Sequence, residues 1–417
     1  MQENFLKEAE YQIKRLRNHP SIALWSGGNE YYPHLDGKFY EKGNYLVRVI
    51  LRGLCGELDG DRIYLHNSPT GLDEDEWRVN TGDAHMSCMD EVLINDSVEE
   101  FRKVISSRTC NFLSESALLG PTRLRSIRKF IPKDDIWPTA DSWDYHFLKN
   151  PYSPIPITCL EKEKIFARKF FGEFDSVQEF LKKGMMAHAE LMRGEIDYTR
   201  VTPLCRGFMN WMYNDMWGCG TWSVVDYYFE RKPAYYTMKR CFAPIYLPIC
   251  ESVNGIKAGV TNDTEKEISG ELICRWKALD GRTLNEKKFS ILVASDSVQS
   301  VDIDCLECDY ISLKFIVDGK LVSKNFYFPN LWKDKSFITD IDWKMKKVDE
   351  GIYKITIKAN AFARAVFVDT KDNEEITYSD NFFDMEKGDE VEVVIKSNLN
   401  LKKGDIKIKT FADVWKD

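Results

Sequence analysis

Residues 19–30, with the sequence HPSIALWSGGNE, decide the fold of the first half of the chain. Within them the apolar run Ile22–Trp25 is typical of a β-strand that is buried on both faces, and polar residues ending in Asn29 and Glu30 follow it directly. Residues 4–17 place apolar side chains near a 3.6-residue period, which predicts an amphipathic helix. This stretch therefore predicts a helix, a strand and a polar loop in succession.

The same succession recurs further along the chain. Its predicted helices are residues 47–54 and 98–106, and its predicted strands are residues 62–65, residues near Met86, residues 110–113 and residues 207–210. Helices that alternate with short apolar strands are the pattern of a parallel sheet with helical crossovers. A capping-box signature at Ser176 and Glu179 predicts the start of one further helix.

After about residue 247 the pattern changes to an alternation of apolar and polar residues, as in Lys354–Lys358. This alternation predicts half-buried antiparallel strands. Turn signals such as Asp318-Gly319 and Lys387-Gly388 separate the strands at the short spacing of β-sandwiches. We therefore expect three domains, an α/β part at residues 1–247, a β-sandwich at residues 248–334 and a second β-sandwich at residues 335–417.

Composition and charge exclude several classes of partner. The 417 residues are 43% apolar and 30% charged, and 58 Lys and Arg against 66 Asp and Glu give a net charge of −8. This is the composition of a folded globular protein, and its acidic balance argues against nucleic acid and against a membrane as partners. We also expect no cofactor and no metal, because Cys305 and Cys308 form a lone pair without further ligands at zinc spacing.

Two acidic residues follow predicted strands, at the ends where parallel barrels hold their catalytic groups. They are Glu30 after the first strand and Glu115 after the strand at residues 110–113. Hydrolysis of a glycoside needs two facing carboxyl groups, one to protonate the leaving oxygen and one to attack the sugar or activate water. The alternative is that both are ordinary acids, solvated or held in salt bridges, and position alone leaves both interpretations open.

Residues 19–30 closely resemble the acid/base segment of glycoside hydrolase family 2. Further segments resemble its β-mannosidase group and the related exo-β-glucosaminidases, and they are Asn67–Thr70, Gly82–His85, Leu113–Glu115, Trp211–Trp217, Ser223–Tyr227 and Lys232–Tyr236. The resemblance covers about residues 1–245. It implies an α/β plus all-β fold, in which residues 1–247 are the C-terminal portion, strands four to eight, of a (β/α)8 TIM barrel, and two Ig-like β-sandwich domains follow.

The resemblance also implies a mechanism and a set of site residues. The activity would be that of a retaining, exo-acting, β-mannosidase-like hydrolase that cleaves terminal β-linked sugars from an oligosaccharide or glycoside by double displacement. Glu30 would be the general acid/base, with a pKa raised towards neutrality, and Glu115 would be the nucleophile, ionised at rest. The implied substrate-binding residues are Asn29, His85, Trp211, Asn214, Asp215 and Trp217.

The first three strands of such a barrel, and the family's N-terminal β-domains, find no counterpart in the sequence. We therefore expect the C-terminal part of a longer enzyme, poorly soluble or inactive unless an N-terminal polypeptide completes the barrel. The alternatives are a non-catalytic carbohydrate-binding or remnant fragment, and a related exo-β-glucosaminidase or β-galactosidase specificity. The sequence leaves the cellular compartment open.

Overall fold

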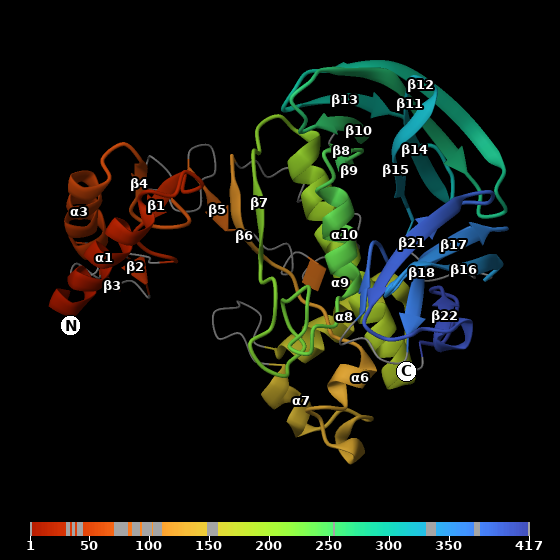
Figure 1. Cartoon of the computed structure of the whole chain (residues 1–417), viewed down its shortest axis with the longest axis horizontal. Coiled ribbons are helices and arrows are strands. Elements are labelled where there is room, and N and C mark those ends of the chain that lie inside the picture. Colours follow the sequence, from red (N-terminus) through yellow and green to blue (C-terminus); the bar gives the residue numbers. More distant parts are fainter. Residues whose placement is uncertain are drawn as a thin grey trace. The chain divides into compact units, whose positions relative to one another are not determined.

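The computed structural model of the chain describes residues 2–30, 34–35, 38–39, 45–70, 82–85, 92–93, 102, 111–147, 157–252, 255–330, 339–370 and 376–415 (Figure 1). The chain divides into two compact units. The first consists of Met1–Met86, Thr109–Ser116 and Leu204–Met209, and the second consists of Ser87–Arg108, Ala117–Pro203 and Asn210–Asp417.

The first unit begins with a helix and contains two short parallel strands. Its elements up to residue 85 are α1 (Gln2–Leu16), β1 (Leu24–Ser26), β2 (His34–Leu35), β3 (Lys38–Phe39), η1 (Leu46–Ile50), α3 (Leu51–Leu58), β4 (Ile63–Leu65) and β5 (Ala84–His85). Helix α1 confirms the helix predicted at residues 4–17, and its Glu3–Lys7 ion pair has the i, i+4 spacing that stabilises exposed helices. Strand β1 is parallel to β4, with Leu24 opposite Ile63.

Strand β1 differs from the sequence prediction in both position and burial. It begins at Leu24 rather than at Ile22, and the side chains of Leu24 and Ile63 are 44% and 67% exposed. The prediction of a strand buried on both faces is therefore wrong for the described residues. Among these residues β4 is the only strand that pairs with β1, and a two-stranded sheet leaves its apolar side chains open.

A second sheet has the strand order β5–β6–β7, with β6 at Leu113–Ala117 and β7 at Phe208–Trp211. Strands β5 and β6 are parallel, so that His85 lies opposite Glu115. Leu113 and Ala84 form a small buried core, against which Cys205 and Phe208 pack. The three strands lie within three residues of their predicted positions, whereas the helix predicted at residues 98–106 lies, apart from Arg102, outside the described residues.

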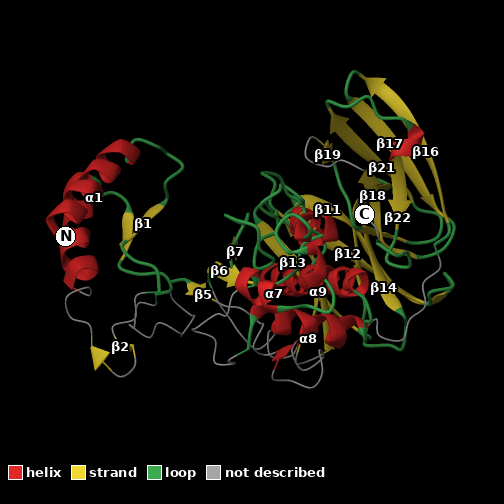
Figure 2. Ribbon diagram, turned by 90° about the horizontal axis from the view of Figure 1, so that it is seen from below, coloured by secondary structure: helices red, strands yellow, loops and turns green. Residues whose placement is uncertain are grey.

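The second unit contains a group of helices (Figure 2), which are α6 (Leu124–Ile127), η2 (Lys133–Asp135), α7 (Asp141–His146), α8 (Cys159–Phe171), α9 (Val177–Val201) and α10 (Pro233–Cys241). Helix α9 begins at the predicted cap, where Ser176 Oγ accepts the backbone N–H of Glu179 at 3.4 Å. The Glu179 carboxylate in turn accepts the N–H of Asp175 at 3.3 Å. Helices α8 and α10 and strands of the next domain pack against α9, which explains why most of its residues are buried.

Eight antiparallel strands follow the helices. They are β8 (Ile245–Tyr246), β9 (Ile249–Ser252), β10 (Gly255–Asn262), β11 (Ile268–Lys277), β12 (Thr283–Val293), β13 (Ser297–Ile303), β14 (Tyr310–Val317) and β15 (Lys320–Tyr327). They form a sheet of β8, β9, β10 and β13 and a sheet with the order β12–β11–β14–β15, and one apolar core contains residues of both. The predicted turn at Asp318-Gly319 joins β14 to β15 with positive φ angles of 52° and 76°, as hairpin turns require.

The last part of the chain has the same two-sheet arrangement. Its strands are β16 (Ile341–Asp349), β17 (Ile352–Ala359), β18 (Ala363–Thr370), β19 (Ile376–Tyr378), β20 (Phe383–Met385), β21 (Glu390–Ser397) and β22 (Ile406–Lys409), and the helix η4 (Lys403–Asp405) precedes β22. They form the sheets β16–β17–β21–β19 and β20–β18–β22. The predicted alternation of burial is present in β17 and β21, whereas β18 is buried along its whole length.

The fold is thus a mixture of helices and strands followed by antiparallel β-structure, as predicted at this level. The domain limits at residues 247 and 334 stay a prediction. None of the described helices is both long and apolar enough to cross a membrane.

Candidate active site

Three ionisable side chains of the first unit meet where its strands end. Glu30 follows β1, His85 ends β5 and Glu115 lies in β6. His85 Nδ1 is 3.0 Å from Glu30 Oε1 and 3.8 Å from Glu115 Oε2. One nitrogen or oxygen atom from each of the three residues lies within 4.8 Å of the others. The two predicted catalytic acids are therefore neighbours, and an imidazole lies next to both.

The backbone between β1 and Glu30 is held by the loop that follows β4. Gly27 N–H donates to Leu65 O at 2.9 Å, and Ser68 N–H donates to Gly28 O at 3.0 Å. Glu30 N–H then donates to Ser68 O at 2.7 Å, and the φ angle of Glu30 is 49°. A positive φ is uncommon for glutamate and costs free energy, so these hydrogen bonds hold the acid in a conformation that it would not adopt alone.

Gly27 is required by the close approach of a tyrosine. A Cβ atom at this position would lie 2.0 Å from Tyr64 Oη. The Tyr64 hydroxyl donates to the carbonyl oxygen of Val47 at 2.5 Å, which anchors it to the helix before β4. The glycine in the sequence SGGNE therefore lets the acid-bearing loop lie directly on β4.

Hydroxyl and carboxylate groups surround the imidazole of His85. Ser68 Oγ is 2.9 Å from His85 Nε2 and 2.5 Å from Asp83 Oδ2. Ser114 Oγ donates to the same Asp83 oxygen at 2.5 Å, and the other oxygen, Oδ1, accepts the N–H of Thr70 at 2.9 Å. The position of His85 is therefore set by residues from three separate loops and strands.

The two carboxylates differ in exposure and in pKa. The side chain of Glu30 is 47% exposed and that of Glu115 is 21% exposed. The hydrogen bond from His85 lowers the pKa of Glu30, although burial opposes this. Burial raises the pKa of Glu115, and the neighbouring Glu30 charge adds to the increase while His85 opposes it.

These directions correct the expectation from the sequence. A raised pKa was predicted for Glu30, but its pKa is lowered, because the hydrogen bond from His85 favours the ionised form. The ionised resting state predicted for Glu115 stays a prediction, although burial raises the pKa of this acid.

A carboxylate, an imidazole and a second carboxylate at this spacing are also side chains that bind divalent metal ions. The direct hydrogen bond of 3.0 Å between Glu30 and His85 fits a different interpretation, because a tetrahedral zinc ion with bonds of about 2.0–2.2 Å separates its ligand atoms further. We therefore interpret the three residues as a group that shares protons.

The other predicted substrate-binding residues belong to both units of the chain. Asn29 is exposed beside Glu30 in the first unit. Trp211 is 48% exposed at the end of β7, and Asn214 is also exposed. Trp217 stacks on His146 with ring centroids 4.9 Å apart, so that it is part of an aromatic cluster of the second unit.

Asp215 does not fit its predicted role as a sugar contact. It is only 2% exposed, and its Oδ2 atom accepts the hydroxyl of Ser223 at 2.6 Å. Its backbone N–H donates to Val225 O at 3.1 Å. The side chain therefore holds the loop between Trp211 and Trp217 in place. The sequence did not predict the burial of Asp215, because burial within an irregular loop leaves no periodic pattern.

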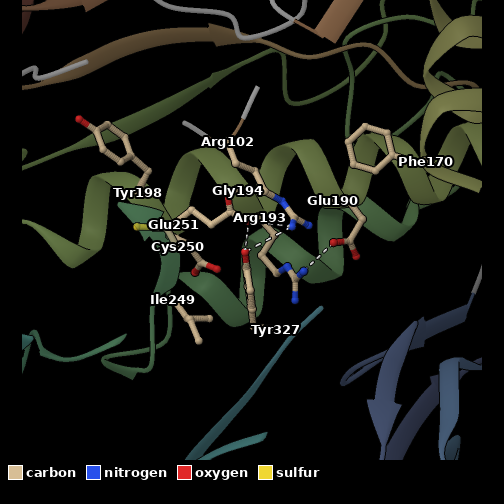
Figure 3. Close-up of a pocket in the computed structure, with 11 residues that line it drawn as sticks. Arg102, Phe170, Glu190, Arg193, Gly194, Tyr198, Ile249, Cys250, Glu251 and Tyr327 are labelled. Carbon is tan, nitrogen blue, oxygen red and sulfur yellow. Dashed lines mark hydrogen bonds and ion pairs between the residues drawn. The ribbon is translucent and has the colours of Figure 1, made fainter. Parts of the chain in front are cut away.

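A cavity of about 40 Å³ lies inside the second unit, between α9 and strands β9 and β15 (Figure 3). Its charged side chains are paired with one another. Arg193 contacts Glu190 at 2.6 Å, and Glu251 accepts the hydroxyl of Tyr327 at 2.6 Å and an N–H of Arg102 at 3.4 Å. Because these charges are already satisfied, we interpret the cavity as part of the packing between the helices and the strands.

Sequence reasoning missed the roles of Ser68, Asp83 and Ser114. The segments that contain them were singled out, but no chemistry was assigned to these residues. One signal was available, because Asp83 and His85 are two residues apart and residues at this spacing share one side of an extended segment.

Comparisons with known proteins bear on the family resemblance and the fold of the chain. Residues 339–414 match the Ig_mannosidase family model, an Ig-fold domain. The chain is thus similar to glycosidases, and the predicted resemblance to the β-mannosidase group of glycoside hydrolase family 2 is confirmed. Among particular relatives, β-mannosidase B of Neosartorya fischeri is 22% identical in an alignment of 447 positions that covers 98% of this chain and 52% of that protein. β-Mannosidase B of Thermothelomyces thermophilus is 26% identical over 59% of this chain and 31% of its own length.

Solved structures show the same likeness in fold. The β-D-mannosidase of Dictyoglomus thermophilum superimposes with a TM-score of 0.82 at 23% identity, over 98% of this chain and 50% of that one. An exo-chitosanase from Amycolatopsis orientalis gives a TM-score of 0.67 at 17% identity, over 97% of this chain and 52% of its own. Nearly the whole of this chain aligns with these relatives, and it spans about half of their length.

Proposed function

We propose that this chain carries the catalytic carboxyl pair of a retaining, exo-acting glycoside hydrolase with β-mannosidase-like activity. The observation that supports this most directly is the distance between Glu30 and Glu115, whose carboxylate oxygens approach within 4.8 Å. Retaining glycosidases place their two carboxyl groups about 5–5.5 Å apart, whereas inverting enzymes separate them by about 6.5–9.5 Å to admit water. The observed spacing favours retention.

In this proposal Glu115 is the nucleophile and Glu30 the general acid/base. Glu115 attacks the anomeric carbon and forms a glycosyl ester, while Glu30 protonates the departing glycosidic oxygen. Glu30 then takes a proton from the water that cleaves the ester. The difference in exposure supports the assignment, because the acid must face the side from which the leaving group departs, and Glu30 is the more exposed acid.

The sugar would be held by the exposed polar and aromatic side chains that the sequence singled out. Asn29 is adjacent to Glu30 and suits a hydrogen bond to the sugar 2-hydroxyl. Trp211 and Asn214 belong to the second unit and stay predicted sugar contacts, and the exposed indole of Trp211 suits stacking against the apolar face of a pyranose ring. The likeness to an exo-chitosanase keeps glucosamine as a second candidate sugar.

We further propose that residues 1–247 are the last five strands of a (β/α)8 barrel and that residues 248–334 and 335–417 are Ig-like sandwiches. The exposure of Leu24 and Ile63 supports additional strands beside β1 and β4, because apolar strand residues of a barrel are normally covered. An N-terminal complementing polypeptide would supply that cover.

The test is a fusion of this chain to the N-terminal region of the Dictyoglomus β-mannosidase that it does not match. The fusion and the chain alone are assayed on a panel of aryl β-mannosides, β-glucosaminides and β-galactosides. We expect the fusion to hydrolyse the mannoside, and equal turnover by the chain alone would refute the need for a complement. If neither hydrolyses any substrate but both bind sugar, the chain is a carbohydrate-binding fragment.

Azide then assigns the two acids in the active fusion. The variant that lacks the nucleophile should form a glycosyl azide of inverted configuration, whereas the variant that lacks the acid/base should form one of retained configuration. We expect the first from Glu115→Gly and the second from Glu30→Gly, measured with a 2,4-dinitrophenyl glycoside. The reverse assignment would exchange the two roles.

A further inference from the structure

We propose that the Nδ1 atom of His85 stores the proton that Glu30 delivers to the leaving group. Ser68 and Asp83 hold the His85 ring in the orientation that points Nδ1 at Glu30. The inference deepens the proposed function and rests on it. It assigns to His85 a role other than the sugar contact that was predicted for it.

The hydrogen bonds on one side of the ring fix the Nε2 atom of His85. Ser68 Oγ lies 2.5 Å from Asp83 Oδ2 and 2.9 Å from His85 Nε2. A hydroxyl has one hydrogen to donate and an ionised carboxylate can only accept. Ser68 therefore donates to Asp83 and accepts from the imidazole, which requires that Nε2 carries a hydrogen.

The other ring nitrogen is then the atom that exchanges a proton with the carboxylates. Nδ1 is 3.0 Å from Glu30 Oε1, within hydrogen-bond distance, and 3.8 Å from Glu115 Oε2. A hydrogen bond of this length contains one proton, which belongs either to Nδ1 or to Glu30. The titratable groups that face His85 in the described residues are Glu30, Glu115 and, through Ser68, Asp83.

The reaction cycle conserves this proton. In the first step the proton moves from Nδ1 to Glu30 Oε1 and leaves a neutral imidazole that still has its Nε2 hydrogen. Glu30 gives the proton to the glycosidic oxygen as the bond from that oxygen to the anomeric carbon breaks and the bond from Glu115 to this carbon forms. In the second step Glu30 takes a proton from water as the ester breaks, and this proton returns to Nδ1.

This cycle accounts for the low resting pKa of the acid. The His85 hydrogen bond lowers the pKa of Glu30, which alone would make it a poor acid. With the proton stored 3.0 Å away, Glu30 does not need to hold it at rest. A bound sugar that excludes water would favour the neutral pair over the charged pair, and so would move the proton to Glu30 when it is needed.

The first test is the protonation of the His85 ring nitrogens, measured by NMR of the full chain with ¹⁵N-labelled histidine. The chain has six histidines, and the signal that disappears in His85→Asn is that of His85. We expect both Nδ1 and Nε2 of His85 to carry a hydrogen in the unmodified chain. Ser68→Ala and the isosteric Asp83→Asn should each shift the Nε2 signal away from its protonated position. His19→Asn, which removes an exposed histidine, should leave the His85 signal unchanged.

The opposite NMR result would overturn the proposal without touching the proposed function. An unprotonated Nδ1 or Nε2 in the unmodified chain would do so, and so would a His85 spectrum that neither Ser68→Ala nor Asp83→Asn alters. Two variants are used because one of them could fail to fold.

The second test compares leaving groups in the active fusion. A 2,4-dinitrophenyl glycoside needs little protonation to depart, whereas a phenyl glycoside needs a general acid. We expect His85→Asn to lower kcat/KM for the phenyl glycoside about 10²–10⁴-fold and to change it much less for the dinitrophenyl glycoside. Equal losses on both substrates would mean that His85 only binds the sugar, and the role of Glu115 would still stand. Ser295→Ala, which alters an exposed serine between β12 and β13, is the matched control for Ser68→Ala.

Discussion

Asp369 of strand β18 should be one of the most sensitive positions for the stability of the second unit. Its carboxylate is only 8% exposed and accepts two N–H groups of Arg123 at 2.8 and 3.1 Å. Lys409 contacts it at 2.7 Å and Arg125 at 3.5 Å. Arg123 is the N-cap residue of α6 and Arg125 lies within this helix, whereas Asp369 belongs to β18, so this ion cluster connects two parts of the second unit.

Replacement of Asp369 by asparagine keeps the shape of the side chain but removes its charge. Breaking a buried ion pair by removing one partner costs about 3–5 kcal/mol, because the other charge stays buried without compensation. Here Glu230 still contacts Arg125 at 2.6 Å and Arg123 at 3.8 Å. We therefore expect a loss at the lower end, about 3 kcal/mol in the free energy of unfolding.

The pH dependence of this loss follows from the same contacts. Arg123, Lys409 and Arg125 hold the pKa of Asp369 well below its usual value, despite an opposing effect of burial. An acid with a lowered pKa stabilises the folded state above its unfolded pKa of about 3.9, and this contribution disappears as the pH falls below that value. The difference between the chain and Asp369→Asn should therefore be full at neutral pH and shrink below about pH 4.

Equilibrium urea unfolding at several pH values measures both effects, with hydrogen exchange of β18 to show that the transition includes this strand. A matched control is Asp280→Asn, whose ion pair with Arg282 lies at the surface and should not alter the urea midpoint measurably. A loss of less than about 1 kcal/mol for Asp369→Asn would refute the reasoning. So would a loss of the same size at pH 3 and pH 7, because at pH 3 the unfolded chain already binds most of the proton that the folded carboxylate still excludes.

Two further predictions concern buried groups of the second unit. Burial raises the pKa of Asp197 to about 7, so that between about pH 4 and pH 7 the unfolded chain binds fewer protons at this site than the folded chain. The free energy of unfolding should therefore fall as the pH rises over that range. Asp197→Asn should flatten this pH dependence in urea unfolding, and an unchanged dependence on pH would contradict the assignment. Gly120→Ala would place a Cβ atom 2.4 Å from His188, a residue with no exposed surface. We expect the free energy of unfolding, measured with urea, to fall by about 1–3 kcal/mol. An unchanged urea midpoint would mean that His188 can move.

Much of the architecture could be predicted from local patterns. The helix α9 begins at Ser176 because a serine can cap a helix whatever surrounds it, and the hairpin at Asp318-Gly319 depends on backbone angles that glycine adopts freely. The position of Glu30 in the loop after β1 follows from the rule that parallel strands carry catalytic groups at their carboxyl ends, whereas Glu115 lies within β6 rather than after it as predicted. These features depend on few distant contacts, so the sequence is sufficient to predict them.

Other features depend on contacts that no local pattern encodes. The opposite directions of the two pKa shifts come from the hydrogen bond of 3.0 Å between His85 and Glu30 and from the burial of Glu115. The burial of Asp215 depends on a hydroxyl eight residues away in an irregular loop. In both cases a residue of the expected type is present at the expected position, and its environment decides what it does.

The candidate site is held mainly by polar contacts. Its strands β4 and β5 have three and two residues, and the local core of β5 and β6 consists of Leu113 and Ala84 with few neighbours. Short strands with a small core cannot fix a side chain by packing alone, so the hydrogen bonds of Asp83 must supply that precision. Loss of one hydroxyl, as in Ser68→Ala, should therefore change the chemistry of His85 while the global stability of the chain changes little. In the second unit large buried cores surround the polar groups, and there a single change such as Asp369→Asn should act on stability first.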